Sequence, residues 1–374
     1  MALSAIRLSE MGTAQQLLTF ILASAVFCLT VRSIWLLYFH PLSKYPGPKI
    51  AATSDVWYTY HSLSGRWPWA LEDALKKYDL YGSHNKNLEL SPKTQINNHG
   101  NDEHGGIIWE WNPPPYLSLL SGFNRAIVVI QMSWRFPLLS PLKYLFLLFT
   151  AMRPYSHIRD HSRQQLEQRI PRNGAVEHRD FFEQLIPEDR EPPKARKEMR
   201  HLEQVAGQLL VAGYEPPAMW FYFTIYHLLK EPVVLETLAK EIRGAFESYS
   251  DITLGAAASL PYPTACLKES LRVMPNVLTG MPVVSPGPVV DGTFIPKGVI
   301  CPSSPFALAR SPRNFCEPLR FRPERWLPEE HPLYDTRFAN DGRKGFRPFS
   351  QGPRMCAGKE IAWWQSRVFI AKIL

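Results

Sequence analysis

A ten-residue stretch near the end of the chain restricts what this sequence can fold into more than any other feature. Residues 349–358 read FSQGPRMCAG and place Cys356 between Gly352 and Gly358. Gly352 and the following Pro353 predict a tight turn, and Gly358 allows a following helix to approach closely. We therefore expect Cys356 at a helix N-terminus, where backbone N–H groups and the helix dipole favour a thiolate.

Two interpretations of Cys356 follow from the residues alone. A free cysteine is often simply a small buried residue. A thiolate held by N–H donors is instead a good ligand for a soft or borderline metal such as haem iron. The chain has five cysteines, scattered and without a C-x-x-C pair, so neither a disulfide framework nor a zinc site is predicted. This usage is typical of a reducing compartment.

The longer pattern Phe-x-x-Gly-x-Arg-x-Cys-x-Gly resembles the haem-binding loop of the cytochrome P-450 family, and all five fixed positions match. The resemblance implies a mainly α-helical fold with small β-sheets and a bound heme b. It implies that Cys356 is the axial ligand of the haem iron, that Arg354 pairs with a haem propionate and that Phe349 packs beside the sulfur. Gly352 and Gly358 complete the expected cofactor-binding set.

A second motif pairs Glu269 with Arg272, three residues apart on one face of a predicted helix. Taken alone, such a pair is common on protein surfaces and has little energetic consequence. Further along the chain, residues 323–326 read PERW. In the P-450 family the Glu-x-x-Arg pair bonds to the arginine of this later motif. The resemblance therefore implies a structural network of Glu269, Arg272 and Arg325 behind the haem.

A third motif lies in a long apolar segment in the middle of the chain. The two prolines there, Pro216 and Pro217, favour a simple kink when the pattern is considered alone. Ala212, Gly213 and Glu215 match the family motif Ala-Gly-x-Glu/Asp-Thr, which opens a groove for dioxygen over the haem. The resemblance implies catalytic roles for Gly213 and Glu215. Because Pro216 replaces the usual proton-relaying threonine, Glu215 with water would have to serve instead.

The N-terminal part contains an apolar span, about residues 17–39, that is long enough to cross a bilayer. Arg32 lies near one end, where its side chain can reach the headgroups, and Trp35 and Tyr38 suit an interface. A cleaved signal peptide is the alternative, but the apolar core is too long and no small-residue cleavage site follows it. Segment 1–39 is therefore expected to be a single-pass anchor in the endoplasmic reticulum membrane, with the rest of the chain in the cytosol.

Residues 40–49 are dense in proline and form either a plain linker or a stiff hinge. In membrane-bound P-450 proteins a similar hinge orients the catalytic domain against the bilayer. Residues 50–374 are expected to form that haem-thiolate domain. Within it we expect helices over 55–80, a polar loop over 81–111, a buried or interfacial helix pair over 116–152 and short strands between Val283 and Pro302 with a turn at Asp291-Gly292.

Some features of the family are absent from this sequence. Its propionate-binding Trp/His-x-x-x-Arg has no clean counterpart, and residues 109–122 contain a proline run there. Val283 stands where many fungal members have an arginine that contacts a propionate. The chain ends at Leu374, before the final sheet of the family. We therefore expect a shortened chain, lacking its C-terminal end, with an incomplete fold.

The net charge of +8 is spread along the chain without a dense basic run, so nucleic-acid binding is not predicted. A moderate positive charge does suit an anionic membrane surface. Basic residues also gather around the cysteine motif, where they form either a solvated face or a docking surface for NADPH–cytochrome P-450 reductase: Arg343, Lys344, Arg347, Arg354 and Lys359.

Together these motifs predict a membrane-anchored haem-thiolate monooxygenase that oxidises a lipophilic small molecule with O₂ and reductase-supplied electrons. The overall resemblance is to filamentous-fungal members that oxidise terpenoids or polyketides in secondary-metabolite and mycotoxin biosynthesis. Two alternatives stay open. One is an inactive truncated relic without haem, suggested by the missing propionate contacts. The other is a haem-thiolate isomerase or peroxygenase, which needs no relay threonine.

Overall fold

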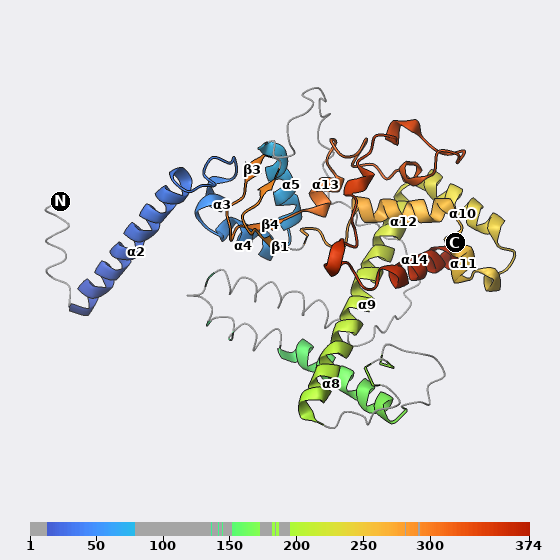
Figure 1. Ribbon diagram of the computed structural model, residues 1–374, viewed down its shortest axis with the longest axis horizontal. Helices are drawn as coiled ribbons and strands as arrows, with labels where there is room; N and C mark the ends of the chain where they lie inside the picture. Colours follow the sequence, from blue (N-terminus) through green and yellow to red (C-terminus); the bar gives the residue numbers. More distant parts are fainter. Residues whose placement is uncertain are drawn as a thin grey trace, which may run out of the picture. The chain divides into compact units, whose positions relative to one another are not determined.

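The computed structural model describes residues 13–78, 152–172, 195–280, 282–290 and 292–374, with a few single positions between 136 and 186. The described elements are mainly helices, with two small antiparallel sheets (Figure 1). This agrees with the predicted fold class. Contacts divide the chain into two compact units: an N-terminal unit, Met1–Ser83 with Thr279–Ala307, and a core unit, His84–Leu278 with Leu308–Leu374.

The longest element of the N-terminal unit is helix α2, Thr13–Tyr38. Its apolar side chains surround the helix instead of forming one stripe, and Phe20 and Phe27 are 71% and 69% exposed. Residues Gln15–Tyr38 are long and apolar enough to cross a membrane, and none of the apolar window is buried within the protein. The helix thus coincides with the apolar span expected at residues 17–39.

Three short helices follow in the N-terminal unit: α3 (Lys49–Thr53), α4 (Val56–Leu63) and α5 (Trp67–Lys77). They confirm the helical region expected over 55–80. Gly65, whose φ of +69° lies in the left-handed region, divides it in two. Trp67 at the start of α5 lies edge-on to Trp57 and Tyr58 of α4, with ring centroids 5.1 and 4.5 Å away.

The strands of the N-terminal unit confirm the small sheets expected between Val283 and Pro302. Strands β2 (Val289–Val290) and β3 (Thr293–Phe294) form an antiparallel hairpin. The turn between them includes Gly292 at φ +73°, as a two-residue hairpin turn requires. Strand β1 (Pro282–Val284) pairs with β4 (Ile300–Pro302), and helix α13 (Pro305–Ala309) follows.

The core unit is built from helices and single turns. The polar loop expected over 81–111 lies outside the described residues, as does nearly all of the helix pair expected over 116–152. The described elements are α8 (Met152–Arg169), η2 (Ile170–Arg172), α9 (Arg196–Lys230), α10 (Pro232–Ala245), η3 (Tyr249–Asp251), α11 (Leu254–Ala258), α12 (Pro261–Val273), η4 (Pro323–Trp326), η5 (Thr336–Phe338), η6 (Arg343–Gly345), η7 (Gly352–Arg354) and α14 (Lys359–Ile373).

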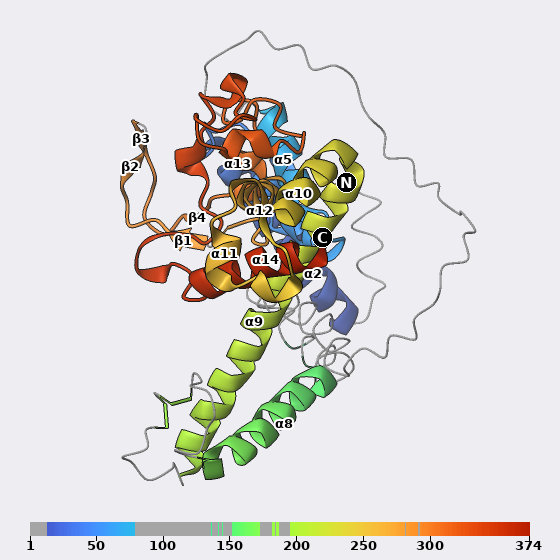
Figure 2. The same ribbon diagram turned by 90° about the vertical axis from the view of Figure 1, so that its right-hand side faces the viewer.

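The main hydrophobic core lies where α9, α10, α12 and α14 meet. Its most buried side chains are Trp220, Leu238, Cys266, Leu267 and Ile370, each at most 1% exposed. A smaller cluster joins α8 to the N-terminal half of α9, which lie against each other in Figure 2. The charge-rich sequence of α8 did not predict a helix, because its few apolar residues only gain a partner when α9 is present.

Helix α9 runs without interruption through Pro216 and Pro217. Neither proline has an N–H, so the carbonyls four residues before them lose their helical donors. The carbonyl of Pro216 accepts a hydrogen bond from Asn276 Nδ2 at 3.0 Å. The opening expected at this motif is therefore a local loss of helical hydrogen bonds within a continuous helix.

His227, near the end of α9, stacks on Phe321 of the core unit with ring centroids 5.1 Å apart. Burial lowers the pKa of His227 from 6.5 to about 4; Glu269 opposes this shift, while Arg272 and Arg310 add to it. The neutral imidazole is thus the form that the folded core accommodates.

This depressed pKa predicts acid sensitivity. Between pH 6.5 and 4 the unfolded chain binds a proton that the folded chain does not. The contribution of neutral His227 to the free energy of unfolding is therefore complete above pH 6.5. It falls by about 2–3 kcal/mol as the pH falls towards 4. We expect His227→Gln to flatten the dependence of the unfolding free energy on pH, measured by urea unfolding in detergent at pH 7 and pH 4. An equally steep dependence in the variant would contradict the prediction.

Candidate functional site

The cysteine loop lies in the core unit directly before α14. Its turn, η7, begins at Gly352, whose φ of +72° is left-handed. The backbone N–H of Cys356 donates to the carbonyl of Phe349 at 2.9 Å, which closes the loop. Helix α14 begins three residues after Cys356, with Gly358 at its N-cap. The prediction that Cys356 directly precedes a helix is therefore confirmed.

The surroundings of Cys356 fit a haem. Its side chain is exposed, and Gly358 adds no side chain beside the Cys356 sulfur, because a Cβ built there would lie 4.0 Å from it. The Arg354 side chain is also exposed. Within the described part of the chain it forms no ion pair, which leaves its guanidinium available for a propionate. An exposed thiol and an exposed guanidinium thus stand two residues apart.

Phe349 connects the loop to two helices. Its half-buried ring contacts Trp220 of α9 and Trp363 of α14, with centroids 6.0 and 6.1 Å away. The two tryptophans also contact each other edge-on, at 5.0 Å and 87°. Sequence reasoning missed both. The only signal was position, since Trp363 lies seven residues after Cys356, in the second turn of the helix that follows it.

Gly213 and Glu215 lie on α9, N-terminal to the contact with the loop. Gly213 precedes Trp220 by seven residues, which places it about 10 Å along the axis on the same helix face. A Cβ at Gly213 would meet nothing within 4 Å, so the helix surface is open there.

Glu215 forms part of the wall of a cavity of about 860 Å³ between α8 and α9. Val211, Ala212 and Pro216 contribute an apolar strip beside it. The rest of the lining is mostly polar or charged and includes Arg159, Ser162, Arg200, Glu203, Gln204, Gly207 and Gln208. A molecule held here would therefore meet polar groups beside the apolar strip.

Glu269, Arg272 and Arg325 come together inside the core unit, and all three side chains are fully buried. Glu269 accepts from Arg272 Nε and Nη2, both at 2.8 Å, and from Arg325 Nε at 3.1 Å. The Trp326 indole and the Arg322 backbone N–H each donate to the same carboxylate at 2.8 Å. The surface interpretation of this acid–base pair is therefore wrong, because its helix face turns inward.

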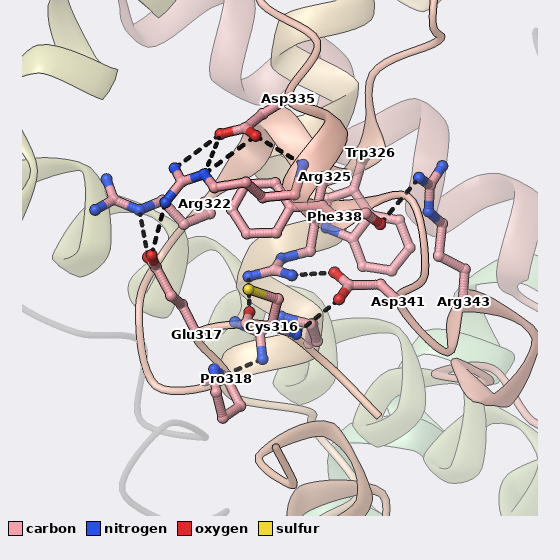
Figure 3. Close-up of polar contacts among 12 residues, drawn as sticks. Cys316, Glu317, Pro318, Arg322, Arg325, Trp326, Asp335, Phe338, Asp341 and Arg343 are labelled. Carbon is pink, nitrogen blue, oxygen red and sulfur yellow. Dashed lines mark hydrogen bonds and ion pairs between the residues drawn. The ribbon is translucent and has the colours of Figure 1, made fainter. Parts of the chain in front are cut away.

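Asp341 is a further member of this network that sequence reasoning missed. Figure 3 shows its carboxylate between Arg325 Nη1 and the backbone N–H of Cys316, which donates to it at 2.7 Å. Two carboxylates thus balance two buried guanidiniums. The Arg325 guanidinium also lies 4.4 Å from the centroid of the Phe338 ring. The sequence motif did indicate a second acid, because two buried arginines with one acid leave an unpaired positive charge, which a protein interior does not tolerate.

The charge balance decides the ionisation of Glu269. Burial raises the pKa of this carboxyl group, but the guanidiniums of Arg272 and Arg325 and the Arg322 N–H lower it more, so that its pKa lies below the ordinary value. The buried carboxylate is therefore charged, and each guanidinium keeps a partner.

Comparison with known proteins places the sequence among similar chains. Residues 117–374 match the family described as cytochrome P450. Cytochrome P450 monooxygenase TwmD of Talaromyces wortmannii is 61% identical over 463 aligned positions, which cover 98% of this chain and 90% of the relative. Monooxygenase poxC of Penicillium oxalicum is 30% identical over 405 positions, covering 91% of this chain and 84% of the relative.

The alignment with TwmD shows that this chain differs from that relative in length. Its 463 positions exceed the 374 residues of this chain, so it contains gaps inside the chain. Relative to TwmD the chain is therefore shortened internally, and the expected loss at its C-terminal end stays a prediction.

We expect removal of either buried carboxylate charge to destabilise the core unit. Glu269→Gln leaves two buried guanidiniums with one acid, and breaking such a buried pair costs about 3–5 kcal/mol. Asp341→Asn should act in the same direction. The control is Asp335→Asn, because its partner Arg337 is 58% exposed and solvent screens the pair. Urea unfolding should show a large loss for the first two variants and a small one for the control. Equal losses in all three would contradict the network.

Proposed function

This chain belongs to the cytochrome P450 family and is a P450 monooxygenase, and we propose that it binds heme b through Cys356 and oxidises a small molecule of fungal secondary metabolism. The observation that carries the proposal is the exposed Cys356 thiol in a closed loop before α14. When bound, a thiolate-ligated haem activates dioxygen, so that one oxygen atom enters the substrate and the other becomes water.

The residues of the loop have distinct tasks in this proposal. The Cys356 thiolate would ligate the iron, and the closed loop before α14 presents it. Arg354 neutralises a propionate. In many fungal members of the family an arginine that contacts a propionate stands at the position of Val283, so the resemblance implies that this chain lacks a second such contact. Retention of the cofactor therefore depends more on Arg354 than it would with two cationic partners.

On α9 we assign positioning and proton delivery to Gly213 and Glu215. Gly213 leaves the helix surface open, because it has no Cβ. Glu215 faces the cavity between α8 and α9 and stands one residue before Pro216, which has no hydroxyl. Its carboxyl group, with water, would supply the protons that reduction of dioxygen consumes. The same cavity is the candidate substrate site, and its mixed lining suits an oxygenated terpenoid or polyketide.

Membrane and partner assignments are also part of the proposal. The long, predominantly apolar helix α2 supports a single-pass anchor in the endoplasmic reticulum membrane. Electrons from NADPH would arrive through cytochrome P-450 reductase. The basic residues around Cys356 suit docking to an acidic partner, since complementary charge accelerates encounter. They are Arg343, Lys344, Arg347, Arg354 and Lys359.

The proposal predicts the carbon-monoxide difference spectrum of the reduced full-length protein in microsomes. Wild type should show the Soret band typical of thiolate-ligated haem, and Cys356→Ala should lose it, because the axial ligand is gone. Cys316→Ser is the control, since this cysteine is also exposed but lies outside the motif. A flat spectrum from folded wild type would overturn the haem proposal and favour an inactive relic.

A second prediction concerns Glu215. Loss of a positioned acid commonly slows proton transfer by two orders of magnitude or more, so Glu215→Gln should lower product formed per NADPH by about tenfold or more. Haem content should stay unchanged. Glu203→Gln is the matched control, since Glu203 lines the same cavity and lies outside the Ala-Gly motif. An equal yield of product per NADPH in the two variants would contradict a role of Glu215 in proton delivery.

A further inference from the structure

We propose that Trp220 and Trp363 are positioning residues that hold Cys356 in place for iron ligation by fixing Phe349. Neither tryptophan belongs to the cysteine motif, to the buried charge network or to the Ala-Gly motif of α9. The inference rests on the proposed haem site, and it concerns the loop that presents the thiolate.

The three aromatic rings form a closed triangle of contacts. Trp220 is 1% and Trp363 9% exposed, so both are buried. Their centroids lie 5.0 Å apart, and each lies about equally far from the Phe349 ring, at 6.0 and 6.1 Å. Trp220 meets the other two rings edge-on, and the Phe349 and Trp363 rings are tilted by 49°. Aromatic contacts of this kind stabilise beyond the area that they bury. Phe349 therefore packs against two rings that also support each other.

Trp220 is itself held in place. Its indole N–H donates to the carbonyl of Leu267 on α12 at 3.1 Å. One turn later on α9, the Thr224 hydroxyl donates to Ser270 Oγ on α12 at 2.9 Å. Leu267 and Ser270 flank the buried Glu269. Trp220 is thus fixed against α12, the helix that carries Glu269 and Arg272.

Trp363 is held from its other side by Arg367. The guanidinium carbon lies 5.1 Å from the centroid of the Trp363 ring, and Arg367 Nε donates to Thr264 Oγ1 of α12 at 3.3 Å. A cation over an indole face is attracted to the ring electrons. Both tryptophans therefore take their positions from contacts to α12.

The backbone transmits the position of Phe349 to the sulfur. The Phe349 carbonyl accepts the N–H of Cys356 at 2.9 Å, so any shift of Phe349 moves the residue that bears the thiol. Between them, Ser350 and Gly352 both have positive φ, at 62° and 72°. A left-handed serine is unfavourable and persists only where its surroundings hold it. The loop therefore depends on the Phe349 contacts to keep its shape.

The inference is tested in the full chain with Trp363→Leu, Trp363→Phe and the control Trp364→Leu. Trp364 is the next residue on α14 and is 46% exposed. Two quantities are measured: the thiolate-ligated fraction of the reduced carbon-monoxide complex, relative to total haem, and backbone amide hydrogen exchange in residues 349–358. The first reports the sulfur, and the second reports the loop without needing haem.

We expect Trp363→Leu to retain haem but to lower the thiolate-ligated fraction by about twofold or more and to speed exchange at the Cys356 amide by about tenfold. Trp363→Phe, which keeps an aromatic ring, should recover most of both properties, and Trp364→Leu should match wild type. An unchanged thiolate fraction with unchanged exchange in Trp363→Leu would overturn the inference.

Failure of the proposed function and failure of this inference give different results. If wild type shows no thiolate band, the proposed function fails, and amide hydrogen exchange in residues 349–358 tests the inference. Faster exchange in Trp363→Leu would then support the positioning of the loop, and unchanged exchange would overturn it. If Trp363→Leu does not fold, Trp220→Phe replaces it. That variant loses the indole N–H bonded to Leu267 but keeps a ring. Intermediate values of both measurements would support the inference, and wild-type values would overturn it.

Discussion

The buried carboxylate of Glu269 is the constraint on which the described core unit depends. It accepts five hydrogen bonds from four residues, and three of them come from two guanidiniums with no exposed surface. Charges this deep are tolerated only when each has a partner. Asp341 supplies the missing negative charge. Helix α12, the η4 turn and the segment leading to the cysteine loop are therefore positioned together, because moving any one of them would leave a charge unpaired.

From this network a series of contacts leads to the thiol. Helix α12 accepts the indole N–H of Trp220, Trp220 and Trp363 hold Phe349, and the Phe349 carbonyl accepts the Cys356 N–H. The polar network and the aromatic triangle act on the same loop by different means. Ion pairs place the helices, whereas ring contacts set the fine position of one backbone carbonyl. Stability and the presentation of the ligand are thus coupled through α12.

Local patterns predicted the elements that depend on neighbouring residues. The apolar run gave α2, and Asp291-Gly292 indicated the turn of the β2–β3 hairpin, which is observed. The turn residues before α14 placed Cys356 at a helix start. Sequence patterns did not predict structure where a segment packs against a partner that is distant along the chain. Helix α8 is too polar to show a helical face until α9 covers it, and the Glu269–Arg272 pair resembles a solvated pair until its helix is buried.

The sequence by itself determined the family, the cysteine loop and the acid–base motifs, because each of these motifs lies within a few consecutive residues. Tertiary structure alone decided which second acid balances Arg325 and which rings meet Phe349. Asp341 lies 16 residues after Arg325 and Trp363 lies 14 residues after Phe349, whereas Trp220 is distant from Phe349 along the chain. In none of these pairs do both residues lie in one helix or strand, so no local pattern predicts the contacts. Packing also decided that the cavity beside Glu215 has a mixed lining. Charge pairing in the interior selects among distant residues, and only the folded chain brings those residues together.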